Sequence, residues 1–238
     1  MRALPVGDRA LLIELADGET AGALHAELLR RRAAGTLPAV REMVPAARTV
    51  LLDGLDHPSG FAREVLEWRI PPLRERAAEV IEVPVRYDGP DLAEVAALWG
   101  VSEEEVVAIH SAVEFRVAFC GFAPGFGYLT GLPQRYAVPR RATPRTSVPS
   151  GSLGLAGAYT GVYPRSSPGG WQLIGTTELE LWEPARKPAA LLSPGVRVRF
   201  VVEPEHTAGR PEQPGPRARS TGPEGPERRR GREPVVGR

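Results

Sequence analysis

The residues best suited to binding a charged molecule lie between positions 121 and 171, where the chain has five arginines and neither aspartate nor glutamate. An arginine side chain is a fork of N–H donors that matches the paired oxygens of a carboxylate or a phosphate. Serine hydroxyls and glycine amides, which can approach an anion closely, occur in the same stretch. The pattern predicts an anion site formed by Arg140, Arg141, Arg145, Ser150, Gly151 and Ser152. The alternative is that the arginines pair with acids elsewhere, such as those of two helices expected after residue 90.

One histidine and four aromatic residues are further candidates for the site. His110 is expected on a helix that ends beside the segment 119–133, where it could act as a general base or orient a substrate group. A packed histidine that bonds a backbone carbonyl is the alternative. Four aromatic residues would pack in the core or at the rim of a pocket, and direct stacking on a ligand is the alternative; either role would leave an apolar pocket wall. They are Phe122, Phe126, Tyr128 and Trp171.

Several classes of protein are disfavoured by what the sequence lacks. The only lysine, Lys187, follows no glycine-rich loop, so there is no P-loop. The four histidines are too far apart for metal-ligand spacing, and we expect no metal bound by this chain. A net charge of +1 argues against a general nucleic-acid binder. Because no long apolar run or signal peptide is present, we expect a cytoplasmic protein with no membrane contact.

Cys120 is the only cysteine, so an internal disulfide is excluded. A small buried side chain is a simpler interpretation of Cys120 than a nucleophile, because the sequence identifies no base to activate the thiol.

Residues 1–78 predict a small α+β domain. Short apolar runs predict strands over 10–15, 40–44 and 49–53, and leucines at helical spacing predict a helix that ends at Gly35. A second helix is expected over 60–68. The predicted order is strand, helix, strand, strand, helix, and the segment contains no group of residues suited to catalysis.

Residues 79–203 predict a second domain built mainly of β structure. A strand over 81–87 precedes a turn, and two helices follow whose capping pairs are Asp91 with Glu94 and Ser102 with Glu105. Gly100 would end the first of these helices. Period-two alternation over 115–120 and in two later segments predicts strands that close a sheet or barrel at Val202.

Residues 204–238 predict a disordered tail. They hold eight arginines and five glutamates, and no aromatic residue that could anchor a core. The arginine run at 228–230 could attract RNA or an acidic partner, although a solvated run of charge is the simpler interpretation.

Three long motifs give the chain a resemblance to a known family. They are "GFAPGFGYLTGLP", "PRRATPRTSVPSGSLGLAG" and "TGVYPRSSPGGWQLIGTT", with His110 upstream and "LLSPGVRVRFV" downstream. Over residues 4–202 the sequence resembles the family of the 5-oxoprolinase B subunit, which is also called PxpB or KipI and allophanate hydrolase subunit 1. The resemblance implies an N-terminal α+β domain followed by a cyclophilin-like β-barrel domain.

The resemblance also implies partners and a reaction. A PxpC or KipA-like protein would complete a composite active site, and with a PxpA-like protein the complex would open the lactam 5-oxo-L-proline to L-glutamate while hydrolysing ATP with Mg²⁺. This chain would then be inactive alone. In such a complex Arg140, Arg141 and Arg145 would bind anionic groups, and residues 150–152 would supply hydroxyls and amides. His110 would orient or deprotonate a substrate group.

Two other functions resemble those of family members and stay open. The chain could be a KipI-like regulatory protein that binds and inhibits a sensor histidine kinase, or half of a biotin-dependent urea or amide carboxyltransferase. One departure concerns the turn "RYDGPDL" at residues 86–92, which is shorter than the family's "YGGEYGPDL". Contacts that the longer turn makes are therefore in doubt for this chain.

Overall fold

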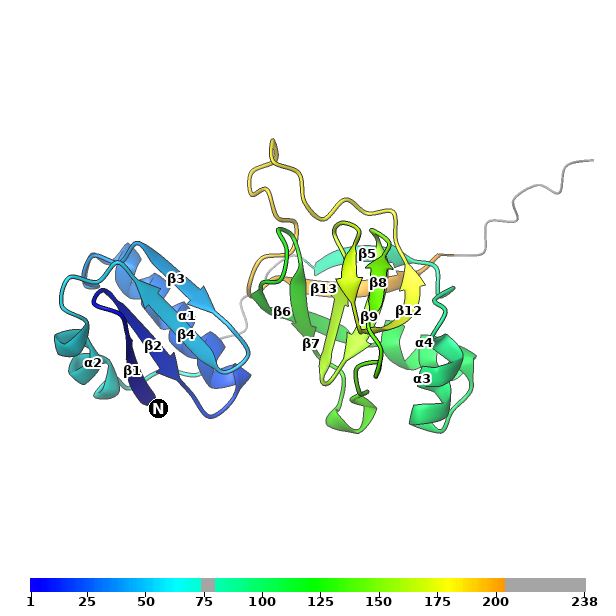
Figure 1. The fold of residues 1–238 in the computed structure, drawn as a ribbon, viewed down its shortest axis with the longest axis horizontal. Helices are drawn as coiled ribbons and strands as arrows, with labels where there is room; N and C mark the ends of the chain where they lie inside the picture. Colours follow the sequence, from blue (N-terminus) through cyan, green and yellow to red (C-terminus); the bar gives the residue numbers. More distant parts are fainter. Residues whose placement is uncertain (74–79, 204–238) are drawn as a thin grey trace, which may run out of the picture. The chain divides into compact units, whose positions relative to one another are not determined.

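The structure, a computed structural model, describes residues 1–73 and 80–203. In the first of these ranges, four strands form an antiparallel sheet in the order β1-β2-β4-β3, together with two helices (Figure 1). In chain order the elements are β1 Arg2–Val6, β2 Ala10–Glu14, α1 Gly18–Ala33, β3 Glu42–Pro45, β4 Thr49–Asp53 and α2 Pro58–Leu66.

Alternating side chains and helical spacing build the core of this part. Val50 and Leu52 of β4 are fully buried, as are Leu24 and Leu28 of α1, which lie one turn apart on one face of the helix. The helix begins with a reciprocal cap between Asp17 and Thr20. The predicted strand over 49–53 is confirmed, and the other predicted elements are confirmed with their ends shifted by a few residues.

The strand β1 was missed by the sequence-based prediction. Its residues are mostly exposed, so the sequence there shows no alternation, and it is held by its pairing with β2 from Arg2↔Glu14 to Val6↔Ala10. The observed order in this part is therefore strand, strand, helix, strand, strand, helix.

In residues 80–203 seven strands form a mixed sheet in the order β12-β9-β10-β7-β6-β13-β5. Only the pairing of β5 with β13 is parallel. The strands of this sheet are β5 Val80–Val85, β6 Glu114–Cys120, β7 Gly127–Thr130, β9 Ser152–Ala156, β10 Tyr159–Val162, β12 Gln172–Thr176 and β13 Arg197–Val202. The helices α3 Leu92–Trp99 and α4 Glu103–Ser111, a short helix Gln134–Tyr136 and a ribbon of β8 Arg145–Val148 with β11 Ser167–Gly169 complete it.

The sheet curls into a nearly closed barrel, and the turn after β5 completes the closure. Arg86 and Thr176 exchange two backbone hydrogen bonds, N to O at 2.9 Å and 2.8 Å. Three residues further on, Gly89 lies against the backbone of β12, and the Asp91 amide donates to the carbonyl of Leu173 at 2.9 Å. The predicted barrel is confirmed, but it closes between residues 86–91 and β12 instead of at Val202.

The two faces of the barrel sheet carry separate apolar clusters. Alternate strand residues such as Leu129, Leu155 and Ile174 pack in one cluster, while their neighbours Tyr128, Ala156 and Leu173 pack in the other. We call the second the aromatic cluster. Its members are Ala123, Phe126, Tyr128, Val148, Ala156, Tyr159, Tyr163, Trp171 and Leu173.

Three predictions fall on or beside residues that the structure does not describe. The domain boundary expected between residues 78 and 79 lies within 74–79, and the boundary at 203 adjoins the second undescribed range. The disordered tail predicted for 204–238 lies outside the described residues. Among residues 1–73 and 80–203, no helix is long and apolar enough to cross a bilayer.

Candidate anion site

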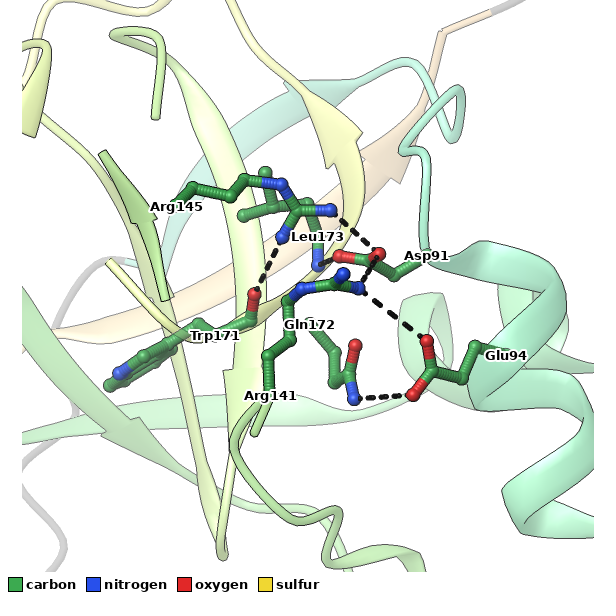
Figure 2. A network of polar contacts seen from close by, with 7 residues as sticks. All are labelled: Asp91, Glu94, Arg141, Arg145, Trp171, Gln172 and Leu173. Carbon is green, nitrogen blue, oxygen red and sulfur yellow. Dashed lines mark hydrogen bonds and ion pairs between the residues drawn. The ribbon is translucent and has the colours of Figure 1, made fainter. Parts of the chain in front are cut away.

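Two of the predicted arginines converge on one buried carboxylate (Figure 2). Arg141 Nη1 and Arg145 Nη2 each donate to Asp91 Oδ1 at 2.7 Å. The other carboxylate oxygen, Oδ2, accepts the backbone N–H of Leu173 at 2.7 Å. Only 3% of the Asp91 side chain is exposed, so all the bonds of this acid are made to the arginines and to β12.

The role of Asp91 differs from the predicted helix cap. Asp91 precedes α3, yet its side chain makes no capping bond, and the predicted pair with Glu94 is wrong. Glu94 instead accepts the Gln172 amide at 3.0 Å and lies 3.5 Å from Arg141 Nη1. The second predicted pair, Ser102 with Glu105, forms a complete capping box at the start of α4. Gly100 ends α3 in the left-handed conformation, as predicted.

The polar network around Asp91 reaches the surface and leaves two buried polar atoms without a partner among the described residues. Glu94 is 54% exposed and brings the network to the surface. Arg141 Nε and Gln172 Oε1 are buried and make no hydrogen bond to any described residue. An unpaired buried donor or acceptor costs about 1–3 kcal/mol. The arrangement therefore satisfies Asp91 fully at the expense of two neighbouring polar atoms.

Arg140 is set apart from the other two predicted arginines. It is exposed and makes no ion pair with a described residue. Its backbone is nevertheless fixed on both sides, because Val138 pairs with Gly157 and the Arg141 amide donates to the carbonyl of Gly170 at 2.8 Å. Of the three, Arg140 is thus the arginine whose charge no described acid offsets.

The structure does not bring residues 150–152 to the arginines. Ser150 Oγ donates to the carbonyl of Pro164 at 3.0 Å, and the Gly151 amide donates to the carbonyl of Tyr163 at 2.7 Å. Ser152 is buried at the start of β9. Residues 80–203 contain no hydrogen bond between these three and a predicted arginine, and their part in an anion site stays a prediction.

His110 lies in the interior of the barrel, where it is fully buried. Its ring packs against Phe115 and Phe200, with centroids 4.8 Å and 4.9 Å away. Nδ1 lies 2.8 Å from the hydroxyl of Tyr87 and Nε2 lies 3.4 Å from Thr160 Oγ1. One neutral tautomer satisfies both contacts, with Tyr87 donating to Nδ1 and Nε2 donating to Thr160. The histidine is packed, as in the alternative interpretation, although its partners are hydroxyls instead of a backbone carbonyl.

Burial sets the protonation of His110 and predicts a pH dependence of stability. Desolvation lowers the pKa of His110 from 6.5 to about 3. Below pH 6.5, His110 is protonated in the unfolded chain but stays neutral in the folded chain. Each further pH unit of acidification therefore lowers the free energy of unfolding by about 1.4 kcal/mol. We expect His110→Gln to flatten the fall in unfolding free energy between pH 6.5 and 5, as measured by urea unfolding.

His57→Gln provides the matched control, because it makes the same change at an exposed position. An unchanged slope in His110→Gln would contradict the assigned burial. The catalytic role predicted for His110 has no support from its position, since no polar atom of its ring faces solvent or an arginine.

The four predicted wall residues differ in burial. Phe126 and Trp171 are 1% and 5% exposed, and their rings meet edge to face at 5.3 Å in the aromatic cluster. Tyr128 is half-buried, and Phe122 is 58% exposed with a left-handed backbone at φ 67°. A non-glycine residue held in that region is strained. The rings pack in the core and at its rim, which is one of the two predicted roles; direct stacking on a ligand, the other role, stays a prediction.

The remaining candidates do not join the site. Burial raises the pKa of the Cys120 thiol to about 11, and Sγ donates to the carbonyl of Leu192 at 3.2 Å. No group of three or more histidine, cysteine or acidic residues among the described residues is placed to hold a metal ion. A shallow hollow of about 520 Å³ beside the start of α2 contains none of the predicted site residues.

Sequence reasoning missed Asp91 and Gln172 as members of the site. One feature pointed to Asp91 and Glu94: an acid-free segment with five arginines has to find its counter-charges elsewhere in the chain. Pairing with acids elsewhere, such as those of the two helices expected after residue 90, was the alternative, and Arg141 and Arg145 pair in this way with Asp91 and Glu94. Gln172 gave no signal in the sequence, because its burial depends on how α3 packs on β12.

Comparison with known proteins places this architecture among carboxyltransferase-type domains. A protein-family model described as "Carboxyltransferase domain, subdomain C and D" matches residues 1–192. The urea amidolyase of Kluyveromyces lactis shares the fold at 19% identity, with a TM-score of 0.63 over 84% of this chain and 15% of that one.

Proteins with higher sequence identity to this chain identify its family within this group of domains. The 5-oxoprolinase B subunit of Escherichia coli O157:H7 is 42% identical over 84% of this chain and 95% of its own length. The solved structure of the protein TTHA0988 matches with a TM-score of 0.69 at 36% identity over 82% of this chain, which spans about 40% of that protein. The chain belongs to the family of the 5-oxoprolinase B subunit.

Proposed function

We propose that this chain is the B subunit of an ATP-dependent 5-oxoprolinase complex that opens 5-oxo-L-proline to L-glutamate. The observation that carries the proposal is the 42% identity to the Escherichia coli protein over 95% of the length of that protein. The same relationship supports a cyclophilin-like class for the barrel, a cytoplasmic location, and assembly with a PxpC-like partner and a PxpA-like partner.

The distribution of charge in the site supports a composite centre. Arg141 and Arg145 share Asp91, and Glu94 lies 3.5 Å from Arg141, so the two positive charges face two acids within the chain. Arg140 keeps its charge for an external anion, and the strained loop at Phe122 displays an aromatic ring beside the aromatic cluster. One exposed cation and a rim of rings can bind and orient a small anion, but they supply no base. The chemistry then requires groups from a partner, and this chain alone is expected to be inactive.

The described residues do not fit a Mg²⁺ site. Hard cations prefer several carboxylate oxygens, but both oxygens of Asp91 are already bonded to arginines and to a backbone amide. Glu94 is occupied by Gln172 and Arg141. We therefore assign ATP and its Mg²⁺ to the complex, and derive no step through them on this chain.

The test is reconstitution. We expect this chain mixed with its PxpC-like and PxpA-like partners to release glutamate from 5-oxo-L-proline in the presence of ATP, and each mixture that lacks one of the three proteins to be inactive. Glutamate is measured by a coupled assay, with the complete mixture minus ATP as the control. A stable assembly of the three chains that yields no glutamate would contradict the proposed substrate.

One observation favours a second candidate. The matching family model is described as a carboxyltransferase domain, which favours carboxyl transfer to an amide such as urea. If the assembled complex leaves 5-oxo-L-proline intact, biotin-dependent carboxylation of urea is the next reaction to assay, and binding to a sensor histidine kinase is the third.

A further inference from the structure

The sheet formed by β1 to β4 carries an apolar row on the face away from its helices. Buried strand residues such as Leu11 and Leu52 pack with the apolar residues of α1 and α2, and alternate residues of the same strands point to the other face, which we call the open face. The strand pairings align four aliphatic side chains of the open face in one row across all four strands: Leu4, Leu12, Leu51 and Val44.

This row has the character of a covered surface. None of its four residues belongs to an apolar cluster of the described residues. Val44 is 42% exposed, and the three leucines are half-buried. A sheet face that stays in water normally carries polar residues, whereas the unbroken apolar runs at residues 10–13 of β2 and 50–52 of β4 are typical of strands covered on both faces. The row therefore indicates an interaction surface.

Both edges of this sheet are protected against pairing with a further strand. The edge strands are β1 and β3, and they contain Pro5 and Pro45. A proline lacks the N–H that a neighbouring strand would bond, and its presence on an edge strand disfavours edge-to-edge association. A partner of this sheet is therefore expected on the open face and not at the edges.

One end of the row has a surplus of positive charge. Arg2 and Arg48 both pair with Glu14, at 3.3 Å and 3.7 Å. Two arginines thus share one acid, and both are mostly exposed, with 70% and 61% of their side chains open to solvent.

The opposite end of the row has the reverse surplus. Arg41 pairs with Asp53, and the residue that pairs with Asp53 on β3 is the exposed Glu42. Two acids thus share one arginine. The open face is therefore apolar in the middle and oppositely charged at its two ends, which makes it complementary to a second copy of itself.

We infer that two copies of this chain pack open face to open face around a two-fold axis that runs along the row. Rotation about this axis lays the row of one copy on the row of the other, and it places each positive end over a negative end. Such a dimer uses the same surface twice, with the two sheets about 10 Å apart. A face of four strands, each four or five residues long, is small for a protein interface, so we expect the dimer population to depend on concentration. This association goes beyond the proposed function and does not depend on it.

Sedimentation equilibrium of the full chain at a series of concentrations tests the dimer. We expect the average mass to rise with concentration from that of one chain toward that of two. Val44→Lys places a charge in the row at an exposed position, and we expect it to raise the Kd of the dimer about tenfold or more. Leu29→Lys is the matched control, because it makes a similar change at a residue of α1 that is 47% exposed, and it is expected to leave the Kd unchanged. A wild-type chain that stays monomeric at every concentration, or an equal effect of the two lysines, would overturn the inference.

Charge reversal tests the orientation of the two copies. Arg48→Glu leaves both ends of the row with a negative surplus, and Glu42→Arg leaves both ends with a positive surplus. Each variant alone is expected to dimerise about tenfold more weakly than the wild type, because like charges meet at both ends. An equimolar mixture of the two variants is expected to form a heterodimer at least as tight as the wild-type dimer. A mixture that stays monomeric would refute the proposed arrangement.

The PxpC-like partner is the other protein that could cover the open face. Loss of the dimer in Val44→Lys with unchanged binding of that partner would support the inference. A wild-type chain that is monomeric alone, and whose binding to the partner is weakened by Val44→Lys but not by Leu29→Lys, would overturn it in favour of a heteromeric interface.

Discussion

Asp91→Asn is expected to destabilise the barrel by about 3 kcal/mol, because it removes the only charge that two partly buried arginines share. The amide that replaces the carboxylate has one acceptor and one donor. Its donor would face either an arginine N–H or the amide of Leu173, which are donors themselves. The side chains of Arg141 and Arg145 are 32% and 24% exposed, which limits the loss to the lower end of the range for a broken buried pair.

Urea unfolding followed by tryptophan fluorescence measures this change. Glu94→Gln is the matched control: the acid belongs to the same network but is 54% exposed, and we expect a change within about 0.5 kcal/mol. A similar loss of unfolding free energy in the two variants would show that burial does not determine how much Asp91 contributes to stability. A loss below about 1 kcal/mol for Asp91→Asn would contradict the network as described.

Contacts within one helix were predicted correctly from the sequence where no distant residue competes for the same side chains. Ser102 and Glu105 satisfy each other across one helical turn, and nothing distant competes for either side chain. Asp91 and Glu94 show the same spacing, but the guanidinium groups of two arginines bind Asp91, and the first of these lies 50 residues away in the chain. Asp91 accepts from two guanidinium groups and from the Leu173 amide. Pairing of two ionised groups adds charge attraction that a neutral helix amide cannot supply, so the long-range partners prevail.

The position of His110 could not be predicted for a related reason. Helical spacing puts His110 on the same face as Val106, and both are buried. The spacing does not tell whether that face meets a loop or the inside of a barrel. Only closure of the sheet brings Tyr87 and Thr160 to the two ring nitrogens. The strand that begins at Gln172 ends at Thr176, although apolar and polar residues continue to alternate in the sequence after it. Thr176 is also the residue that pairs with Arg86 where the barrel closes.

The closing turn gives the second large effect: Gly89→Ala is expected to cost about 3 kcal/mol or more. A Cβ at residue 89 would overlap backbone atoms of Leu173, Ile174 and Gly175, which belong to a paired strand and cannot move separately. Overpacking against flexible side chains costs about 1–3 kcal/mol, and a backbone wall relaxes less. This contact shows that the turn at residues 86–92 lies directly against β12.

Gly60→Ala provides the control for this change, because a Cβ there meets only the Cβ of His57 at 4.0 Å. That residue lies within helix α2, where alanine is favoured over glycine by up to about 1 kcal/mol, so Gly60→Ala should be neutral or stabilising. Because the Asp91 amide and carboxylate both bond Leu173, a displaced turn also pulls Asp91 from Arg141 and Arg145. The two variants Gly89→Ala and Asp91→Asn should therefore lose less together than the sum of their separate losses. Full additivity in urea unfolding would show that barrel closure and the arginine network are independent.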